Sequence, residues 1–308
     1  MTATILVTGA TGKLGQRVVS RLLQKEAKVR VLTRRGEDAL KLWGDRVDIS
    51  EGNFSDPASL KEASRATDTV FLLSPIGETL AADQKAVIDA ALSASVSRIV
   101  KISGSDWTIA NAARSISGAA HAEVEKHLAG SGIAHTVLRP NAWMQVALEP
   151  VVAALRHGED VPTRFGDAAV SFIDADDIAD VAVHALTAST SVSSALVLTG
   201  GEALTALEIA RIAARILHRP VGISHHSASV FPPHIGAFEQ TAIGEFGQLI
   251  REGLAASVNG NIERITGRQP RSVEAYLRAR LAATTPQGNH SEGEKTWRRL
   301  FHCLKVPN

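Results

Sequence analysis

The fold class follows from one stretch, Thr4-Ile-Leu-Val-Thr-Gly-Ala-Thr-Gly-Lys-Leu-Gly15. The apolar run at its start is typical of a short buried strand in a parallel sheet, and glycines follow it at positions 9, 12 and 15. In this pattern glycines permit a tight turn, let backbone N–H groups approach a pyrophosphate, and let the next helix pack closely on the strand. The stretch therefore predicts a dinucleotide-binding turn.

The first half of the chain alternates strand-like and helix-like segments. We expect strands at residues 4–8, 28–33, 47–51, 69–74, 98–103 and 134–139. We expect helices at residues 57–66, 80–95 and 118–130, the first with Asp56 as its N-cap and Pro57 at the first helical position. This alternation predicts an α/β fold of the Rossmann type, a doubly wound parallel sheet with helices on both faces.

The second half has a different rhythm. A short strand at 170–174 leads into an acid-rich helix start at Asp176, a further strand follows at 195–199, and Thr205 with Glu208 forms a capping box for a helix through Leu217. Residues 231–281 have a helical pattern interrupted by Gly and Pro. We therefore expect a dinucleotide-binding domain at 1–150, to which a strand and a helix return near 170–200, and a smaller, mostly helical substrate lobe at 151–283. We expect a polar linker and an amphipathic tail helix at 284–308.

The residues after the second expected strand bear on the choice of cofactor. That strand ends in Arg34-Arg35, and the next carboxylate along the chain is Glu37. An NAD-specific site of this kind usually places an acid here, whereas guanidinium groups suit a 2′-phosphate. We therefore expect NADPH/NADP as the cofactor. The alternative interpretation is a solvated basic pair that closes the strand.

Composition limits the class of partner. The chain has 308 residues, 44% of them hydrophobic, a formal net charge of +1 and a single cysteine, Cys303. The charge gives no reason to expect nucleic acid as a partner, and no apolar run has the length of a membrane span. One cysteine excludes an intramolecular disulfide and suits a reducing compartment. We expect a cytoplasmic protein with a small-molecule substrate and no metal site. A homodimer is compatible with the sequence, and the tail helix is a candidate docking element.

Several separated motifs resemble the atypical short-chain dehydrogenase group that contains NmrA-like proteins and bacterial NADPH:quinone reductases. The narrower markers are Ser131-Gly-Ile-Ala-His-Thr-Val-Leu-Arg-Pro-Asn141 and Asp174-Ala-Asp-Asp-Ile-Ala179. The remaining motifs are Thr8-Gly-Ala-Thr-Gly12, Gly52-Asn-Phe-Ser-Asp-Pro57, Phe71-Leu-Leu-Ser-Pro75 and Lys101-Ile-Ser-Gly104. The resemblance covers most of residues 1–280.

The resemblance implies a set of binding residues. The pyrophosphate is expected at Gly9, Ala10, Thr11, Gly12, Leu14 and Gly15. The 2′-phosphate is expected at Arg34 and Arg35, the adenine at Asn53 and Phe54, and the nearer ribose at Leu73, Ser74 and Pro75. The nicotinamide end is expected at Ser103, Pro140 and Asn141. Trp143 and Met144 are expected to form a wall of the substrate pocket, with core packing as an equally weighted alternative.

The usual catalytic pair of the broader superfamily, a tyrosine with a lysine four residues later, is missing. The only tyrosine is Tyr276, which lies in the expected substrate lobe, and residue 280 is Arg. The resemblance places Ser117 at the tyrosine position and His121 at the lysine position, with Glu125 one helical turn further on. We expect Glu125 to orient and charge the His121 imidazole, with Ser103 and Lys101 as weaker catalytic candidates. The alternative is an ordinary surface helix carrying His and Glu.

Two classes of function remain open. The first is an NADPH-dependent oxidoreductase that transfers hydride to a quinone-like or other conjugated small molecule, with His121, Glu125 and Ser103 as catalytic candidates. The second is a redox-sensing regulator of the NmrA type that binds NADP(H) without turnover. A nucleotide-sugar epimerase ranks third because its chemistry uses the missing tyrosine.

Overall fold

The computed structural model describes residues 3–189, 194–225 and 236–282. The chain forms two compact units. The first takes residues up to 104 together with 117–139 and 176–197, and the second takes 105–116, 140–175 and the described residues from 198 onward. The chain passes between the units more than once, so neither unit is a single contiguous range.

The first unit contains a seven-stranded sheet in the order β3-β2-β1-β4-β5-β6-β8. Its strands are β1 (Thr4–Val7), β2 (Lys28–Thr33), β3 (Asp48–Glu51), β4 (Thr69–Leu72), β5 (Arg98–Ile102), β6 (Ala134–Pro140) and β8 (Ser194–Leu198). The pairings from β3 through β6 are all parallel. The Rossmann-type sheet and the existence of its six expected strands are confirmed, as is the further strand at 195–199.

The helices of the first unit lie on both faces of this sheet. They are α1 (Lys13–Gln24), α2 (Gly36–Trp43), α3 (Pro57–Ser64), α4 (Leu80–Ser93), α6 (Ile116–Gly130) and α9 (Ala175–Thr187), with a short 3-10 turn at Gly44–Arg46. The Asp56 side chain accepts a hydrogen bond from Ala58 N at 3.0 Å, which confirms the expected N-cap of α3.

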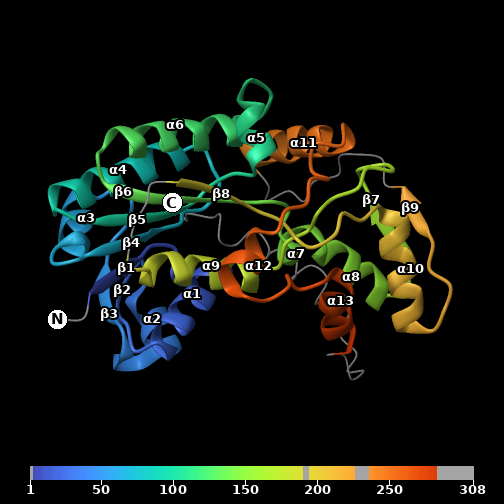
Figure 1. Ribbon diagram of the computed structural model, residues 1–308, viewed down its shortest axis with the longest axis horizontal. Coiled ribbons are helices and arrows are strands. Elements are labelled where there is room, and N and C mark those ends of the chain that lie inside the picture. The colour runs from blue at the N-terminus through green and yellow to red at the C-terminus, as the bar shows by residue number, and fades with distance from the viewer. Residues whose placement is uncertain (1–2, 190–193, 226–235, 283–308) are drawn as a thin grey trace. The chain divides into compact units, whose positions relative to one another are not determined.

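Both faces of the sheet are covered by helices, and one face also carries ion pairs between two helices. In Figure 1, α4 and α6 lie above the sheet and α1 and α9 lie below it. The upper face buries a continuous apolar core that includes Val87 and Ile88 of α4, Val124 of α6 and Leu72 of β4. On the lower face α1 is tied to α9 by Arg21, whose guanidinium contacts Asp176 and Asp180 at 2.7 Å each. Asp176, in the acid-rich start of α9, therefore joins α9 to α1 through Arg21, as Asp180 does.

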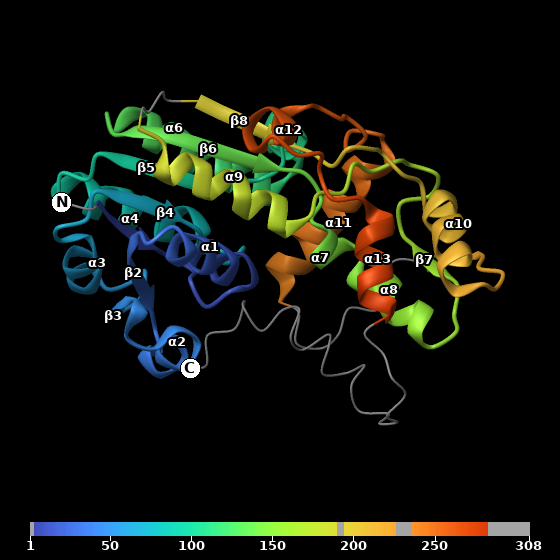
Figure 2. The ribbon, with the colours of Figure 1, turned by 60° about the horizontal axis from the view of Figure 1, so that its bottom comes forward.

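The second unit is mostly helical. Its helices are α5 (Asp106–Ala110), α7 (Met144–Ala147), α8 (Glu149–Arg156), α10 (Ala206–Leu217), α11 (Ala237–Arg251), α12 (Asn261–Thr266) and α13 (Val273–Ala282), with a 3-10 turn at Ala112–Arg114. Strands β7 (Val161–Thr163) and β9 (Ile223–His225) form a two-stranded parallel sheet. Figure 2 shows β7 beside α8 and α10. The predicted capping box of Thr205 and Glu208 opens α10 as expected.

The expected strand at 170–174 is wrong. Val170 pairs with Leu204 in an antiparallel bridge and Ile173 pairs with Trp143 in a parallel one. Phe172 N donates to Val170 O at 3.2 Å, so a turn across three residues interrupts the extended backbone between the two bridges. Apolar residues do alternate here, but Val170 and Ile173 pair with different segments of the chain. The expected linker and tail helix at 284–308, and the first residues of the helical stretch that begins at 231, lie outside the described residues.

Among the helices of the described ranges, none has both the length and the apolar composition that a bilayer crossing requires.

The glycine turn yields a stability prediction. A Cβ at Gly15 would lie 2.1 Å from Gly9 O and 2.7 Å from Ala10 Cα, because α1 packs directly against the turn. We therefore expect Gly15→Ala to destabilise the fold by about 2–3 kcal/mol, measured by urea denaturation. Gly130→Ala, at the open end of α6 where nothing lies within 4 Å, is the matched control and should change stability by no more than about 0.5 kcal/mol. Equal effects of the two substitutions would contradict this account of the turn.

Candidate functional site

The turn between β1 and α1 depends on glycines and backbone hydrogen bonds. Gly9 has a φ of +62°, and a Cβ there would lie 2.9 Å from Leu73 O. Gly12 N donates to Gly9 O at 3.1 Å and Gly12 is the N-cap of α1. No side chain caps this helix and no acidic residue lies in its first turn. The positive end of the α1 dipole is therefore left for an anion from outside the chain.

The neighbouring strand is joined to this turn by one side chain. Thr8 Oγ1 donates to Leu73 O at 2.8 Å and accepts from Leu73 N at 2.9 Å. Beyond it, Ser74 Oγ accepts from the buried amide of Gln84 at 2.9 Å, and Pro75 is exposed. The structure thus brings the expected pyrophosphate and ribose residues to adjacent strand ends, where ligands of open α/β sheets bind.

The expected 2′-phosphate residues lie at the end of β2. Arg34 and Arg35 are both exposed, and Arg35 Nε contacts Asp38 Oδ2 at 2.7 Å. A carboxylate that sequence reasoning missed is also present, since Glu51 Oε1 accepts from Gly36 N at 2.8 Å. Glu51 comes from β3, where it is paired in register with Thr33 of β2. Its proximity follows from strand pairing and not from spacing along the chain.

The expected adenine residues follow β3. Asn53 Oδ1 accepts from Ser55 N at 2.9 Å and from Ser55 Oγ at 2.6 Å, which fixes a local turn. Phe54 is half-buried and packs against the apolar core on the α4 side of the sheet. Both residues therefore lie near the end of β3, and a ring face of Phe54 is partly covered by the protein.

A buried polar cluster lies at the end of β5. Lys101 is fully buried, and its Nζ contacts Ile102 O at 3.1 Å, Ser103 Oγ at 3.0 Å and His121 Nδ1 at 3.1 Å. Leu72 of β4 and Val137 of β6 flank it in register. Lys101, a weaker catalytic candidate in the sequence, is therefore at the centre of this cluster. Its amine contacts two of the expected catalytic residues, Ser103 and His121.

An ion pair closes the cluster. Ser103 Oγ donates to Glu125 Oε1 at 2.6 Å, and Arg139 Nε donates to the same oxygen at 3.2 Å. Arg139 Nη2 also pairs with the second Glu125 oxygen. Ser117, the expected equivalent of a tyrosine, is half-buried in the first turn of α6. The structure thus places Ser103, His121 and Glu125 together, with Lys101 and Arg139 as additional members.

The charges in the cluster differ from the sequence expectation. Burial lowers the pKa of Lys101 from 10.5 to about 7, with Glu125 opposing this shift and Arg139 adding to it. Burial and the neighbouring Lys101 hold the pKa of His121 well below 6.5. The expectation that Glu125 charges the imidazole is therefore wrong. Among the described contacts none joins His121 to Glu125, and the neutral ring faces an amine instead of a carboxylate.

The second unit holds the remaining expected residues. Asn141 is buried, and its amide Nδ2 donates to Ser171 Oγ at 2.5 Å and to Ala255 O at 2.8 Å. Its Oδ1 accepts from Trp107 Nε1 at 2.7 Å. Pro140 O accepts from Ser105 Oγ at 2.9 Å. Both amide hydrogens and the oxygen of Asn141 are thus engaged in holding this unit together.

Trp107 was not among the expected residues. Its ring is half-buried and lies 4.6 Å from that of Phe246. The ring pair joins α5 to α11. A single tryptophan before a polar turn gives no periodic signal, so only the fold reveals this contact.

The expected substrate wall has two different members. Trp143 is half-buried, whereas Met144 is buried in the core of the second unit. Met144 also lines a cavity of about 200 Å³ together with Phe172, Glu202 and Arg271. The Met144 side chain therefore packs in the core and also forms part of a cavity wall.

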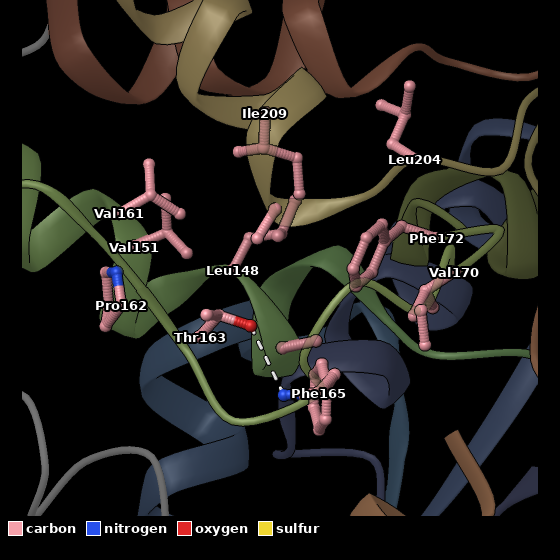
Figure 3. Close-up of a pocket in the computed structure, with 13 residues that line it drawn as sticks. Leu148, Val151, Val161, Pro162, Thr163, Phe165, Val170, Phe172, Leu204 and Ile209 are labelled. Atoms are coloured by element: carbon pink, nitrogen blue, oxygen red, sulfur yellow. Dashed lines mark hydrogen bonds between the residues drawn. The ribbon is translucent and has the colours of Figure 1, made fainter. Parts of the chain in front are cut away.

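A second cavity is apolar and small. Figure 3 shows Leu148, Val151, Phe172 and Ile209 around it, with the Thr163 hydroxyl bonded to Phe165 N at 3.2 Å. Its volume is about 40 Å³. This apolar cavity is smaller than the one that Met144 lines.

The single tyrosine serves another purpose. Tyr276 Oη donates to Glu149 Oε1 at 2.6 Å, and Arg280 Nη2 donates to Glu149 Oε2 at 2.8 Å. Burial and this hydrogen bond raise the pKa of Tyr276. Both residues are thus bound to one buried carboxylate within the second unit. Among the described residues no group of three His, Cys, Asp or Glu side chains is arranged to hold a metal ion.

Comparison with known proteins identifies the family of this chain. The sequence matches the model of the NmrA-like family over residues 1–277. The chain belongs to the NmrA-like family. A relative from Streptomyces griseus, (4-alkanoyl-5-oxo-2,5-dihydrofuran-3-yl)methyl phosphate reductase, is 32% identical over 292 residues, 92% of this chain and all of that protein. The NAD(P)H azoreductase of Xenophilus azovorans is 30% identical over 91% of this chain and 98% of its own length.

Solved structures support the fold. The NADPH-dependent quinone oxidoreductase of Escherichia coli complexed with NADPH superposes with a TM-score of 0.78 at 22% identity, covering 90% of this chain and 99% of that one. At this identity the likeness shows the shared NmrA-like fold.

The buried lysine of this NmrA-like chain leads to a pH prediction. The folded state releases the Lys101 proton near pH 7 and the unfolded chain near pH 10.5, so between these values the unfolded state binds more protons. Raising the pH through this window therefore stabilises the fold, and lowering it removes that contribution. We expect the free energy of unfolding of wild type, relative to Lys101→Met, to rise by about 2 kcal/mol between pH 7 and pH 9. Urea denaturation at both pH values measures this, and a constant difference would contradict it.

Proposed function

We propose that this NmrA-like protein is an NADPH-dependent reductase of small conjugated electrophiles. The observation that carries the proposal is the β1–α1 turn, which ends at Gly12, the N-cap of a helix whose N-terminus no side chain caps. Such a terminus binds phosphate groups through backbone N–H groups and the helix dipole. The azoreductase relative uses NAD(P)H, which supports the same cofactor class here.

The residues present fit NADPH in three respects. Gly9, Gly12 and Gly15 keep the turn free of side chains where a Cβ at Gly9 or Gly15 would meet backbone. Arg34 and Arg35 offer two exposed guanidinium groups for the 2′-phosphate. Asn53, Phe54 and the stretch Leu73–Pro75 are available to the adenosine half. When bound, the cofactor supplies a hydride.

The acceptor class is inferred from the relatives' chemistry. The Streptomyces relative acts on a ring in which a double bond is conjugated to carbonyl groups, and the Xenophilus relative reduces azo compounds. Both acceptors are conjugated double bonds that take a hydride at one atom and a proton at another. A quinone has the same requirement, so we propose this group of electrophiles as substrates.

The chain's own contribution is positioning and proton supply. Ser103 directly follows β5, at the carboxyl end of the sheet, and its hydroxyl is held by Glu125. Glu125 accepts from this hydroxyl, whereas His121 contacts Lys101, which in turn donates to the hydroxyl. We propose that Ser103 contacts the substrate heteroatom, with Glu125 setting the orientation of its hydroxyl. Tyr276, bound to Glu149, takes no part, so the reaction proceeds without a tyrosine and lysine pair.

The proposal is tested by binding and turnover together. Calorimetric titration of the purified protein with NADPH, NADP⁺, NADH and NAD⁺ should show selective binding of the phosphorylated pair. Anaerobic addition of a quinone or an azo dye to the NADPH complex should then oxidise it, as loss of absorbance or fluorescence shows. Selective binding without oxidation by any acceptor would overturn the reductase and favour a redox-sensing regulator.

The arginine pair gives a sharper test of the cofactor. Arg34→Ala with Arg35→Ala should weaken NADPH binding by about 10- to 100-fold and NADH binding by much less, because a charged hydrogen bond contributes roughly 1.5–3 kcal/mol. Arg65→Ala is the matched control, since Arg65 is also exposed and also paired with an acid three residues away. Equal losses for the two cofactors would remove the 2′-phosphate assignment.

A further inference from the structure

The unusual feature of the buried cluster is that Lys101 has three acceptors and no exposure. An ammonium group has three N–H donors, and Lys101 Nζ lies 3.0–3.1 Å from Ile102 O, Ser103 Oγ and His121 Nδ1, which accepts in the tautomer that carries the ring proton on Nε2. A neutral amine has only two donors. The arrangement of acceptors is therefore complete for the protonated form, although the lysine is fully buried.

The charges around this amine oppose each other. Glu125 of α6 favours the ammonium, whereas burial and Arg139 of β6 disfavour it. His121 of α6 is neutral, and the flanking residues on β4 and β6, Leu72 and Val137, are apolar. The protonated and neutral forms of Lys101 are thus close in free energy, which is the condition for a group that gives up a proton and takes it back.

The cluster also provides a route for that proton. Lys101 is 0% exposed, whereas Ser103 and His121 are each 5% exposed. Lys101 Nζ donates to Ser103 Oγ, and Ser103 is the residue that directly follows β5. The contacts of Lys101 that lead toward the surface are therefore the Ser103 hydroxyl and the His121 imidazole.

We propose that Lys101 is the proton reservoir of the reduction and acts on the substrate through Ser103. This proposal rests on the reductase function proposed above. It assigns the role of the missing tyrosine and lysine pair to a strand residue and a serine.

The electrophile takes a hydride from NADPH at one atom of its conjugated system, so NADPH is oxidised to NADP⁺ and the electrophile is left with a negative charge on an oxygen or nitrogen. The Ser103 hydroxyl turns from Glu125 to that atom and gives it a proton, while the Lys101 ammonium returns a proton to Ser103 Oγ. Lys101 ends as a neutral amine and is protonated again from water. Lys101 touches neither substrate nor cofactor in this scheme, so it is a positioning residue.

The test uses two kinds of acceptor. A neutral quinone or azo dye needs a hydride and a proton, whereas a cationic acceptor such as N-methylacridinium or a triarylmethane dye becomes neutral on taking a hydride alone. We expect Lys101→Met to lower kcat with the neutral acceptor by about 10²-fold at pH 7. The rate with the cation, and the Kd for NADPH measured by fluorescence, should change little.

A second variant guards against misfolding. Ser103→Ala keeps Lys101 but removes its route, and should lower the rate with the neutral acceptor as Lys101→Met does. Thr69→Val, a buried polar to apolar change on the neighbouring strand β4 outside this cluster, should leave both rates intact. In wild type the rate with the neutral acceptor should fall as the pH rises between about 6 and 9, and this limb should be absent from Lys101→Met.

The outcomes separate the two proposals. Equal losses with both acceptors, an unchanged rate with the neutral acceptor, or an unchanged pH limb in Lys101→Met would each overturn the role of Lys101 while the reductase stands. A wild-type protein that binds NADPH but reduces neither acceptor would overturn the reductase and this role with it.

Discussion

The close approach of α1 to the end of β1 is the constraint on which the site depends. A Cβ at Gly15 would lie 2.1 Å from Gly9 O, so the helix packs directly against the turn only because Gly15 lacks a Cβ. This contact directs the uncapped N-terminus of α1 to the carboxyl edge of the sheet. Thr8 then fixes β4 to the same edge through both polar groups of Leu73. Backbone donors thus gather where an anionic ligand can reach them.

The polar cluster at the end of β5 follows a second constraint, because the side chain of Lys101 is fully buried in a central strand. Its cost of burial is offset by three acceptors and by the nearby Glu125, and that carboxylate is in turn neutralised by Arg139. The residues that hold Lys101 therefore also join β5, α6 and β6. The hydrogen bonds that hold this cluster together are also those that the proposed proton transfer uses. A loss of total activity therefore does not separate the two roles, whereas a difference between neutral and cationic acceptors does.

Sequence predicted most reliably what neighbouring residues determine. The Asp56 N-cap, the Thr205 capping box and the strand positions of the sheet depend on local patterns, and all are found. The partners of Glu51 and His121 depend on strand register and helix placement, which spacing along the chain does not show. Glu125 faces His121 on a helical wheel, yet Arg139 and Ser103 take its oxygens. The alternation at 170–174 was misleading for the same reason, since its residues pair with two different segments.

The central claim is that a dinucleotide binds at the N-terminus of α1, and amide chemical-shift mapping tests it most directly. NADP⁺ titrated into ¹⁵N-labelled protein should shift the backbone amides of Thr11, Gly12 and Lys13 first, together with Arg34 at the end of β2. Amides of the second unit's small apolar cavity, such as Val151 and Ile209, should shift least. Saturable shifts confined to other parts of the chain, or none at these glycine-turn amides, would contradict the account.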